Sequence, residues 1–127
     1  MKFPELGWMT RYVEVVNGDP ELRLIGRFFT CDLLLDFEAA RYLLRVLEGT
    51  IRDVVPSPGH DRPWQFALRA PRSVWEKYLQ PVPPPLHHHL FAMLMRVPEF
   101  KLEGNTLTAA QNIRALARMC DLMRGVA

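Results

Sequence analysis

The sequence lacks the long apolar runs and charge blocks that mark several classes of protein. No stretch of its 127 residues reaches the roughly 18 consecutive apolar residues that a membrane span requires. The first residues, MKFPELGWMTRYVEVV, lack the apolar core and small-residue cleavage site of a secretory signal. The formal net charge of +2 is too small to indicate a polyanionic partner. We therefore expect a cytoplasmic protein that binds no nucleic acid and has no integral membrane association.

Cysteine is scarce, with Cys31 and Cys120 as the two examples. They lie far apart, one in a strand pattern and the other in a helix pattern. Two buried reduced thiols are therefore favoured over a disulfide, which agrees with a cytoplasmic location. The length suits one hydrophobic core, so residues 1–127 are expected to form a single domain.

Motifs of catalysis are also absent. The chain has no GxGxxG, no Walker-type loop and no GxSxG elbow. A nucleophilic Ser57 or Ser73 would need help from His60 and Asp61, and that pair lies in a Pro/Gly-rich stretch typical of a loop. We therefore predict no catalytic residues and no cofactor, and a protein that is not an enzyme.

Metal binding is disfavoured at the conspicuous run His87-His88-His89. Adjacent residues on a helix point about 100° apart, so one ion cannot easily take all three side chains. One histidine is expected to pack and two to face water. Asp32 and Asp36 share a strand face at a separation of roughly 13 Å, which is too far for a catalytic pair, and are interpreted as solvated residues.

Apolar periodicity predicts five strands and five helices. Residues at alternate positions predict strands over 27–37, 41–47, 50–55, 64–69 and 99–103. Helical spacing and capping signals predict helices over 3–17, 20–24, 72–79, 86–96 and about 106–125. The first four strands are interpreted as an antiparallel meander with one wet face. The expected fold is α/β in the α+β sense: a five-stranded, mainly antiparallel sheet with helices packed on one face.

The segment 86–125 is expected to cover the dry face of that sheet. It carries Met93, Met95, Met119 and Met123, and flexible methionines suit a cavity that accepts varied apolar ligands. The same methionines are also typical of ordinary core filling, which the pattern alone favours.

The stretch EFKLEGN, Glu99 to Asn105, followed by a helix with Ala109, resembles the sterol carrier protein 2 family of small lipid-binding and lipid-transfer domains. The strand and helix over 64–79 and the Leu/Met-rich helix over 90–95 are similar to that family as well. The likeness runs from about Pro20 to the end. Pro98 stands where the family usually has glycine, and residues 81–89 replace a small loop.

The resemblance implies a tunnel between the sheet and the C-terminal helix that holds a fatty acyl chain, acyl-CoA or sterol. Carried over by position, the candidate lining residues are Phe66, Phe91, Leu94, Met95, Phe100, Ile113, Leu116, Met119 and Met123. Arg96 or Arg114 would meet an anionic head group. The predicted function is non-enzymatic binding or transfer of a hydrophobic small molecule or lipid. The alternative is a structural or interaction protein, a homodimer or accessory subunit, with a filled core.

Overall fold

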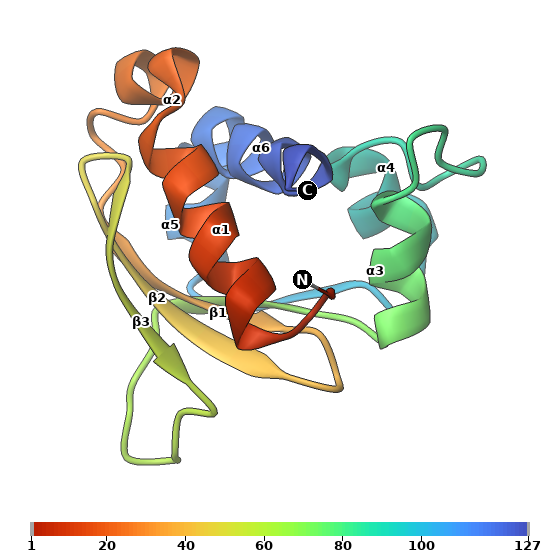
Figure 1. Cartoon of the computed structure of the whole chain (residues 1–127), viewed down its shortest axis with the longest axis horizontal. Coiled ribbons are helices and arrows are strands. Elements are labelled where there is room, and N and C mark those ends of the chain that lie inside the picture. The colour runs from red at the N-terminus through yellow and green to blue at the C-terminus, as the bar shows by residue number, and fades with distance from the viewer. Residues whose placement is uncertain (1, 127) are drawn as a thin grey trace.

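The computed structural model describes residues 2–126 as a twisted sheet with helices on one side (Figure 1). The helices are α1 (Leu6–Asn17), α2 (Pro20–Ile25), α3 (Arg72–Tyr78), α4 (Leu90–Arg96), α5 (Thr106–Gln111), α6 (Ile113–Asp121) and the 3-10 helix η1 (Leu122–Gly125). The strands are β1 (Cys31–Asp36), β2 (Arg41–Leu47), β3 (Thr50–Pro56), β4 (Phe66–Arg69) and β5 (Lys101–Gly104). The predicted fold class is confirmed.

The strand order, β3-β2-β1-β4-β5, corrects the predicted four-strand meander. β4 does not continue from β3 but crosses to the other side of β1 and pairs with it in parallel, Leu33 beside Phe66. The other three pairs are antiparallel. The physical reason is the composition of β1, whose Leu33, Leu34 and Leu35 are all buried, because a strand that is apolar on both faces belongs in the centre of a sheet.

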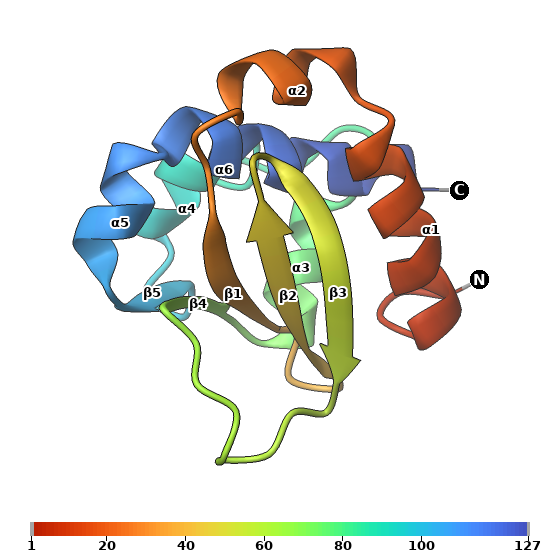
Figure 2. The same cartoon turned by 90° about the vertical axis from the view of Figure 1, so that its left-hand side faces the viewer.

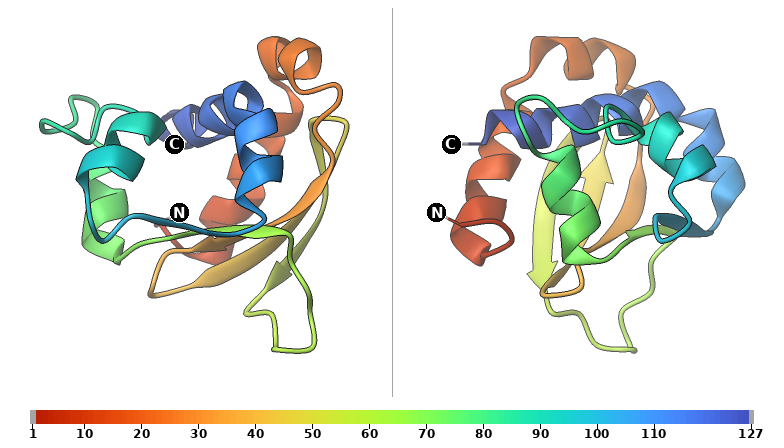
Figure 3. Two further views of the ribbon diagram at one scale, coloured as in Figure 1. Left: turned by 180° about the vertical axis from the view of Figure 1, so that it is seen from behind. Right: turned by 90° about the vertical axis from the view of Figure 1, so that its right-hand side faces the viewer.

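The helices form one layer over the inner face of the sheet. α6 crosses above the strands and packs against α2 and α4, while α1 lies beside β3 (Figure 2). α3 and α4 stand at the other end of this layer, as the views from behind and from the right show (Figure 3). The buried aromatic and aliphatic side chains of both layers form one apolar core.

The single helix predicted at the C-terminus is divided into α5, α6 and the 3-10 helix η1. Asn112, at φ −118° and ψ 27°, separates α5 from α6, and its side chain donates to the carbonyl of Thr108 (3.0 Å). An asparagine side chain that bonds the backbone carbonyl four residues earlier competes with regular helical pairing, which explains the break. α4 begins at Leu90 rather than 86, because the prolines at 83–85 precede it and His89 is extended.

The turn between β2 and β3 packs against the segment that joins α2 to β1. Gly49 has φ 79°, and a Cβ there would lie 2.8 Å from the carbonyl oxygen of Gly26. Its N–H donates to the carbonyl of Phe29 (2.9 Å). The predicted Glu48-Gly49 turn is therefore correct, and only glycine fits it without strain. The contact fixes the segment 26–29 against the sheet.

The edge of β3 is partly closed by a side chain from α1. Asn17 donates its Nδ2 to the carbonyl of Ile51 (3.0 Å), and its Oδ1 accepts from the N–H of Ile51 (2.8 Å). This pair imitates the bonding of a neighbouring strand. Unpaired edge groups invite strand-to-strand association, so Asn17 protects the edge.

Both cysteines are free and buried, as predicted. Within residues 2–126, no helix combines the length and apolar character needed to cross a bilayer.

Candidate ligand-binding site

Most of the residues predicted to line a tunnel lie in the apolar core or against it. Those that are buried in the common core are Phe66, Phe100, Leu116, Met119 and Met123. Leu94 and Ile113 are partly buried and pack against that core. Seven of the nine predicted residues therefore belong to the common core or pack against it.

Phe91 and Met95 lie outside this core. Their side chains are 50% and 80% exposed, because Leu90 and Met93 occupy the inner side of α4. In a helix of only seven residues, Phe91 and Met95 stand one turn apart on the same outer side. In this structure they form part of the surface and not of the core.

The C-terminal end of the layer is held by buried phenol groups. Tyr12 of α1 donates its hydroxyl to the carbonyl of Met119 (2.6 Å), and Tyr78 of α3 donates to the carboxylate of Asp121 (2.7 Å). Burial raises the pKa of both phenols, so both remain protonated donors at ordinary pH. Burial likewise raises the pKa of the Cys120 thiol to about 12, which makes it an inert core residue.

Two ion pairs tie α6 to the start of α2. Arg118 donates from Nε and Nη2 to the Asp19 carboxylate at 3.0 and 2.8 Å, and its Nε lies 2.8 Å from Glu21. The bond from Arg118 lowers the pKa of Asp19, whose side chain also caps α2 by accepting from the N–H of Leu22. α6 therefore joins α1, α2 and α3 through polar contacts, two of which come from buried phenols.

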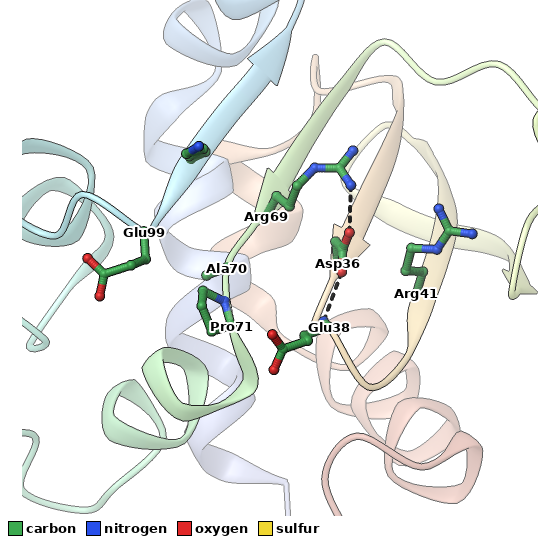
Figure 4. Close-up of a pocket in the computed structure, with 8 residues that line it drawn as sticks. Asp36, Glu38, Arg41, Arg69, Ala70, Pro71 and Glu99 are labelled. Carbon is green, nitrogen blue, oxygen red and sulfur yellow. Dashed lines mark hydrogen bonds and ion pairs between the residues drawn. The ribbon is translucent and has the colours of Figure 1, made fainter.

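A second feature lies on the outer face, where β1 and β4 end. A surface depression of about 510 Å³ is lined there by Asp36, Glu38, Arg41, Arg69, Ala70, Pro71, Glu99 and Lys101 (Figure 4). Arg69 donates to Asp36 (2.7 Å) and also bonds Glu103. Asp36 is only 7% exposed, so its interpretation as a solvated residue was wrong: it is a buried partner of Arg69. The lining mixes three acids with three bases and shows no preference for one ligand charge.

The histidine run behaves as expected. His87 is buried and its Nδ1 contacts the carbonyl of Pro85 (2.9 Å), whereas His88 and His89 are exposed. Among residues 2–126 no group of three His, Cys, Asp or Glu side chains could hold a metal ion. His60 and Asp61 are exposed in the loop that follows β3.

The comparisons with known proteins concern the fold. No family model matches the sequence, and no curated protein matches it significantly. The crystal structure of sterol carrier protein 2 superposes with a TM-score of 0.80 at 19% identity, over 99% of this chain and 100% of that one. The chain has the sterol carrier protein 2 fold.

Two further structures share the sterol carrier protein 2 fold with this chain. A conserved hypothetical protein from Thermus thermophilus has a TM-score of 0.74 at 20% identity, covering 100% of this chain and 91% of its own. The ubiquinone synthesis protein UbiJ-SCP2 has a TM-score of 0.61 at 18% identity, covering 98% and 97%. The resemblance that the EFKLEGN stretch indicated is thus confirmed at the level of the fold, over nearly the whole chain.

The sequence pattern did not predict the outer depression or the side-chain contacts that hold α6 against α1 and α2. The Asp36–Arg69 pair depends on the parallel pairing of β1 with β4, which sets Asp36 beside Arg69 in the register. The Tyr12–Met119 and Asp19–Arg118 contacts join residues that are 107 and 99 positions apart. Periodicity reports which side chains turn inward, but it does not report which of them meet.

Proposed function

We propose that this protein binds an apolar, lipid-like ligand, such as a fatty acyl chain, acyl-CoA or sterol, between the sheet and α6, and catalyses no reaction. The observation that carries the proposal is the likeness to sterol carrier protein 2 over the whole length of both chains. The proposed lining consists of the nine residues named from the sequence, of which Phe91 and Met95 would join only if α4 turns inward. The proposed compartment is the cytoplasm, since both thiols are reduced.

The chemistry of the layer supports this proposal. Its side chains are apolar, and each methylene of a ligand that leaves water there contributes about 0.8 kcal/mol. Met119 and Met123 are buried in it, and their unbranched, polarisable side chains can change rotamer to make room for a chain. Leu94 and Ile113, at its partly exposed margin, mark the side from which a ligand would enter. Arg114, exposed beside Ile113, is placed to meet a carboxylate or phosphate head group.

The test is ligand uptake by the purified protein. Native mass spectrometry is expected to show a co-purified lipid or acyl chain, and a fluorescent fatty acid is expected to bind and to be displaced by palmitate. Ile113→Trp is expected to fill the margin of the layer and weaken binding at least about tenfold, because added core volume opposes the ligand. Leu107→Trp, at a side chain of α5 that is 65% exposed, is the matched control and is expected to bind normally. A clean apo mass together with no fatty-acid uptake would refute the proposal.

A second candidate is an interaction protein with a filled core. It is favoured by the dense packing of Met93, Met119 and Met123, and by the outward side chains of Phe91 and Met95. Under this alternative the protein is a homodimer or an accessory subunit, and the layer holds no ligand. Light scattering after size exclusion separates the two candidates: a salt-resistant dimer that takes up no fatty acid supports the second.

A further inference from the structure

An exposed apolar and cationic surface lies where the α2–β1 segment meets the start of α6. We call it the Phe28 surface, and it consists of Leu24, Ile25, Arg27, Phe28 and Arg114, which line a depression of about 390 Å³. Phe28 is 81% exposed and Leu24 is 63% exposed. Single exposed apolar residues are ordinary on protein surfaces, so the argument rests on the grouping and on its charge.

Phe28 is exposed because its neighbours hold the backbone in place. Leu22 and Phe29, on either side, are 0% and 1% exposed and belong to the core. The N–H of Phe29 donates to the carbonyl of Gly26 (2.8 Å), and the β2–β3 turn closes over Gly26 through Gly49. The segment is therefore fixed on its inner side, and Phe28 cannot turn inward without displacing Phe29.

The charge of the Phe28 surface is positive. The guanidinium of Arg27 lies over the Phe28 ring, 5.0 Å from its centre, and Arg114 is exposed on the first turn of α6. No acidic side chain lines the depression among residues 2–126. Asp19 and Glu21, the acids of the neighbouring α2, are engaged by Arg118 at 2.8 Å each. Glu48, in the turn that packs on Gly26, is not part of the lining.

We propose that the Phe28 surface docks the protein on an anionic lipid bilayer, with Phe28 and Leu24 inserted among the head groups and Arg27 and Arg114 paired with lipid phosphates. Apolar side chains flanked by arginine suit the boundary between head groups and acyl chains. Both apolar side chains are more than half exposed, which suits insertion into a fluid interface. A folded partner would instead need a pocket that buries most of each side chain. The docking requires no ligand in the inner layer.

Co-sedimentation with vesicles tests this proposal. The protein is expected to bind vesicles of equimolar phosphatidylcholine and phosphatidylglycerol, to bind pure phosphatidylcholine weakly, and to be released by salt. The double variant Arg27→Glu and Arg114→Glu is expected to bind at least about 30-fold more weakly, since each basic residue contributes about fivefold. The control, Arg41→Glu with Arg62→Glu, makes the same change of charge at other exposed sites and is expected to lose less than about threefold.

A label reports directly which surface meets the lipid. Because both native cysteines are buried, a polarity-sensitive fluorophore can be attached at Phe28→Cys alone. Its emission is expected to shift to the blue with the anionic vesicles, whereas the same label at Val82→Cys, an 80% exposed side chain in the loop between α3 and α4, is expected not to shift. Three results would overturn the proposal: no binding of the wild-type protein to anionic vesicles, binding by the charge-reversed double variant that is as tight as that of the wild type, or a blue shift at position 82 and not at position 28.

Discussion

Asn17 shows how one side chain can serve two elements. It ends α1, and its amide forms two hydrogen bonds with the backbone of Ile51 at the edge of β3. The carboxamide of asparagine can supply a donor and an acceptor to the same peptide edge, as a neighbouring strand would. Its sequence position, before a glycine, indicated only the end of a helix.

We expect Asn17→Ala to lower the free energy of unfolding by about 2 kcal/mol, because two partly buried hydrogen bonds are lost. Urea unfolding followed by circular dichroism measures this. Asn17→Asp keeps the acceptor for the Ile51 N–H but sets a carboxylate against the Ile51 carbonyl. Its free energy of unfolding should therefore be no higher than that of Asn17→Ala. An unchanged midpoint in Asn17→Ala would show that water replaces the amide without cost.

The Asp19 carboxylate makes the free energy of unfolding depend on pH. Its pKa is lowered in the folded protein, first by the hydrogen bond from Arg118. A carboxyl with a lowered folded pKa contributes fully above its unfolded pKa, near 3.8, and the contribution is lost as the pH falls through the folded pKa.

We therefore expect Asp19→Asn to cost roughly 1–3 kcal/mol near pH 7, and we expect this cost to shrink as the pH falls from about 3.8 through the lowered pKa of the folded carboxyl. Asparagine remains a good cap for α2, so the comparison isolates the charge. Urea titrations across this pH range give the difference. A cost that stays constant with pH would assign the effect to packing.

At the scale of elements, the C-terminal 3-10 helix fixes the proline-rich loop. Arg124 donates its Nε to the carbonyl of Tyr78 (2.7 Å) and its Nη2 to the carbonyls of His87 and His88 (3.1 and 2.6 Å). Its guanidinium also lies 4.1 Å from the centre of the Tyr78 ring. The loop over 81–89, which replaces the small loop expected for the family, is thus tied to the end of the chain.

We expect Arg124→Ala to destabilise the protein by roughly 2–3 kcal/mol and to speed hydrogen exchange in the segment 80–90 before it does so elsewhere. Exchange measured by mass spectrometry localises the effect. Arg96→Ala removes an exposed arginine from the end of α4 and serves as the control. Equal acceleration over the whole sheet would show that Arg124 supports the fold as a unit.

The elements themselves were largely predictable, because strands and helices of this size carry their period in the sequence. β2 was predicted with its observed bounds, and α3 differed by one residue at its end. The errors occur where a turn hydrogen bond or the pairing of distant strands determines the bounds or the neighbour of a strand. The strand predicted from residue 27 begins at Cys31, because the Phe29 N–H bonds back to Gly26 in a turn. The meander was wrong because no local signal states that β4 pairs with β1.

The candidate site was predictable in part for the same reason. Phe66, Leu116 and Met119 turn inward by periodicity and are buried together. Phe91 and Met95 were assigned to the lining from their position in the family, and they face outward because Leu90 and Met93 occupy the inner side of α4. Their role, like that of the whole lining, stays a prediction until a ligand is measured.

At the scale of the whole molecule, the reactivity of the two thiols reports whether the sheet and α6 unfold in one step. Cys31 belongs to the sheet and Cys120 to α6, and burial raises the pKa of each to about 12. We expect both thiols to react with a disulfide reagent only when the protein unfolds. Cys31→Ala and Cys120→Ala each retain one native thiol, and these two thiols should react at the same slow rate. A faster reaction of Cys120 would show that α6 detaches from the sheet by itself.

The contacts between Tyr12 and Met119, and between Asp19 and Arg118, have a consequence for synthesis of the chain. The first helix finds its partner only after about a hundred further residues have been made. At 5 to 20 residues per second, roughly 5 to 20 seconds pass in which Trp8, Met9 and Tyr12 have no native cover on that side. During this interval the earliest hydrophobic segment of the nascent chain lacks the α6 partner that it has in the folded protein.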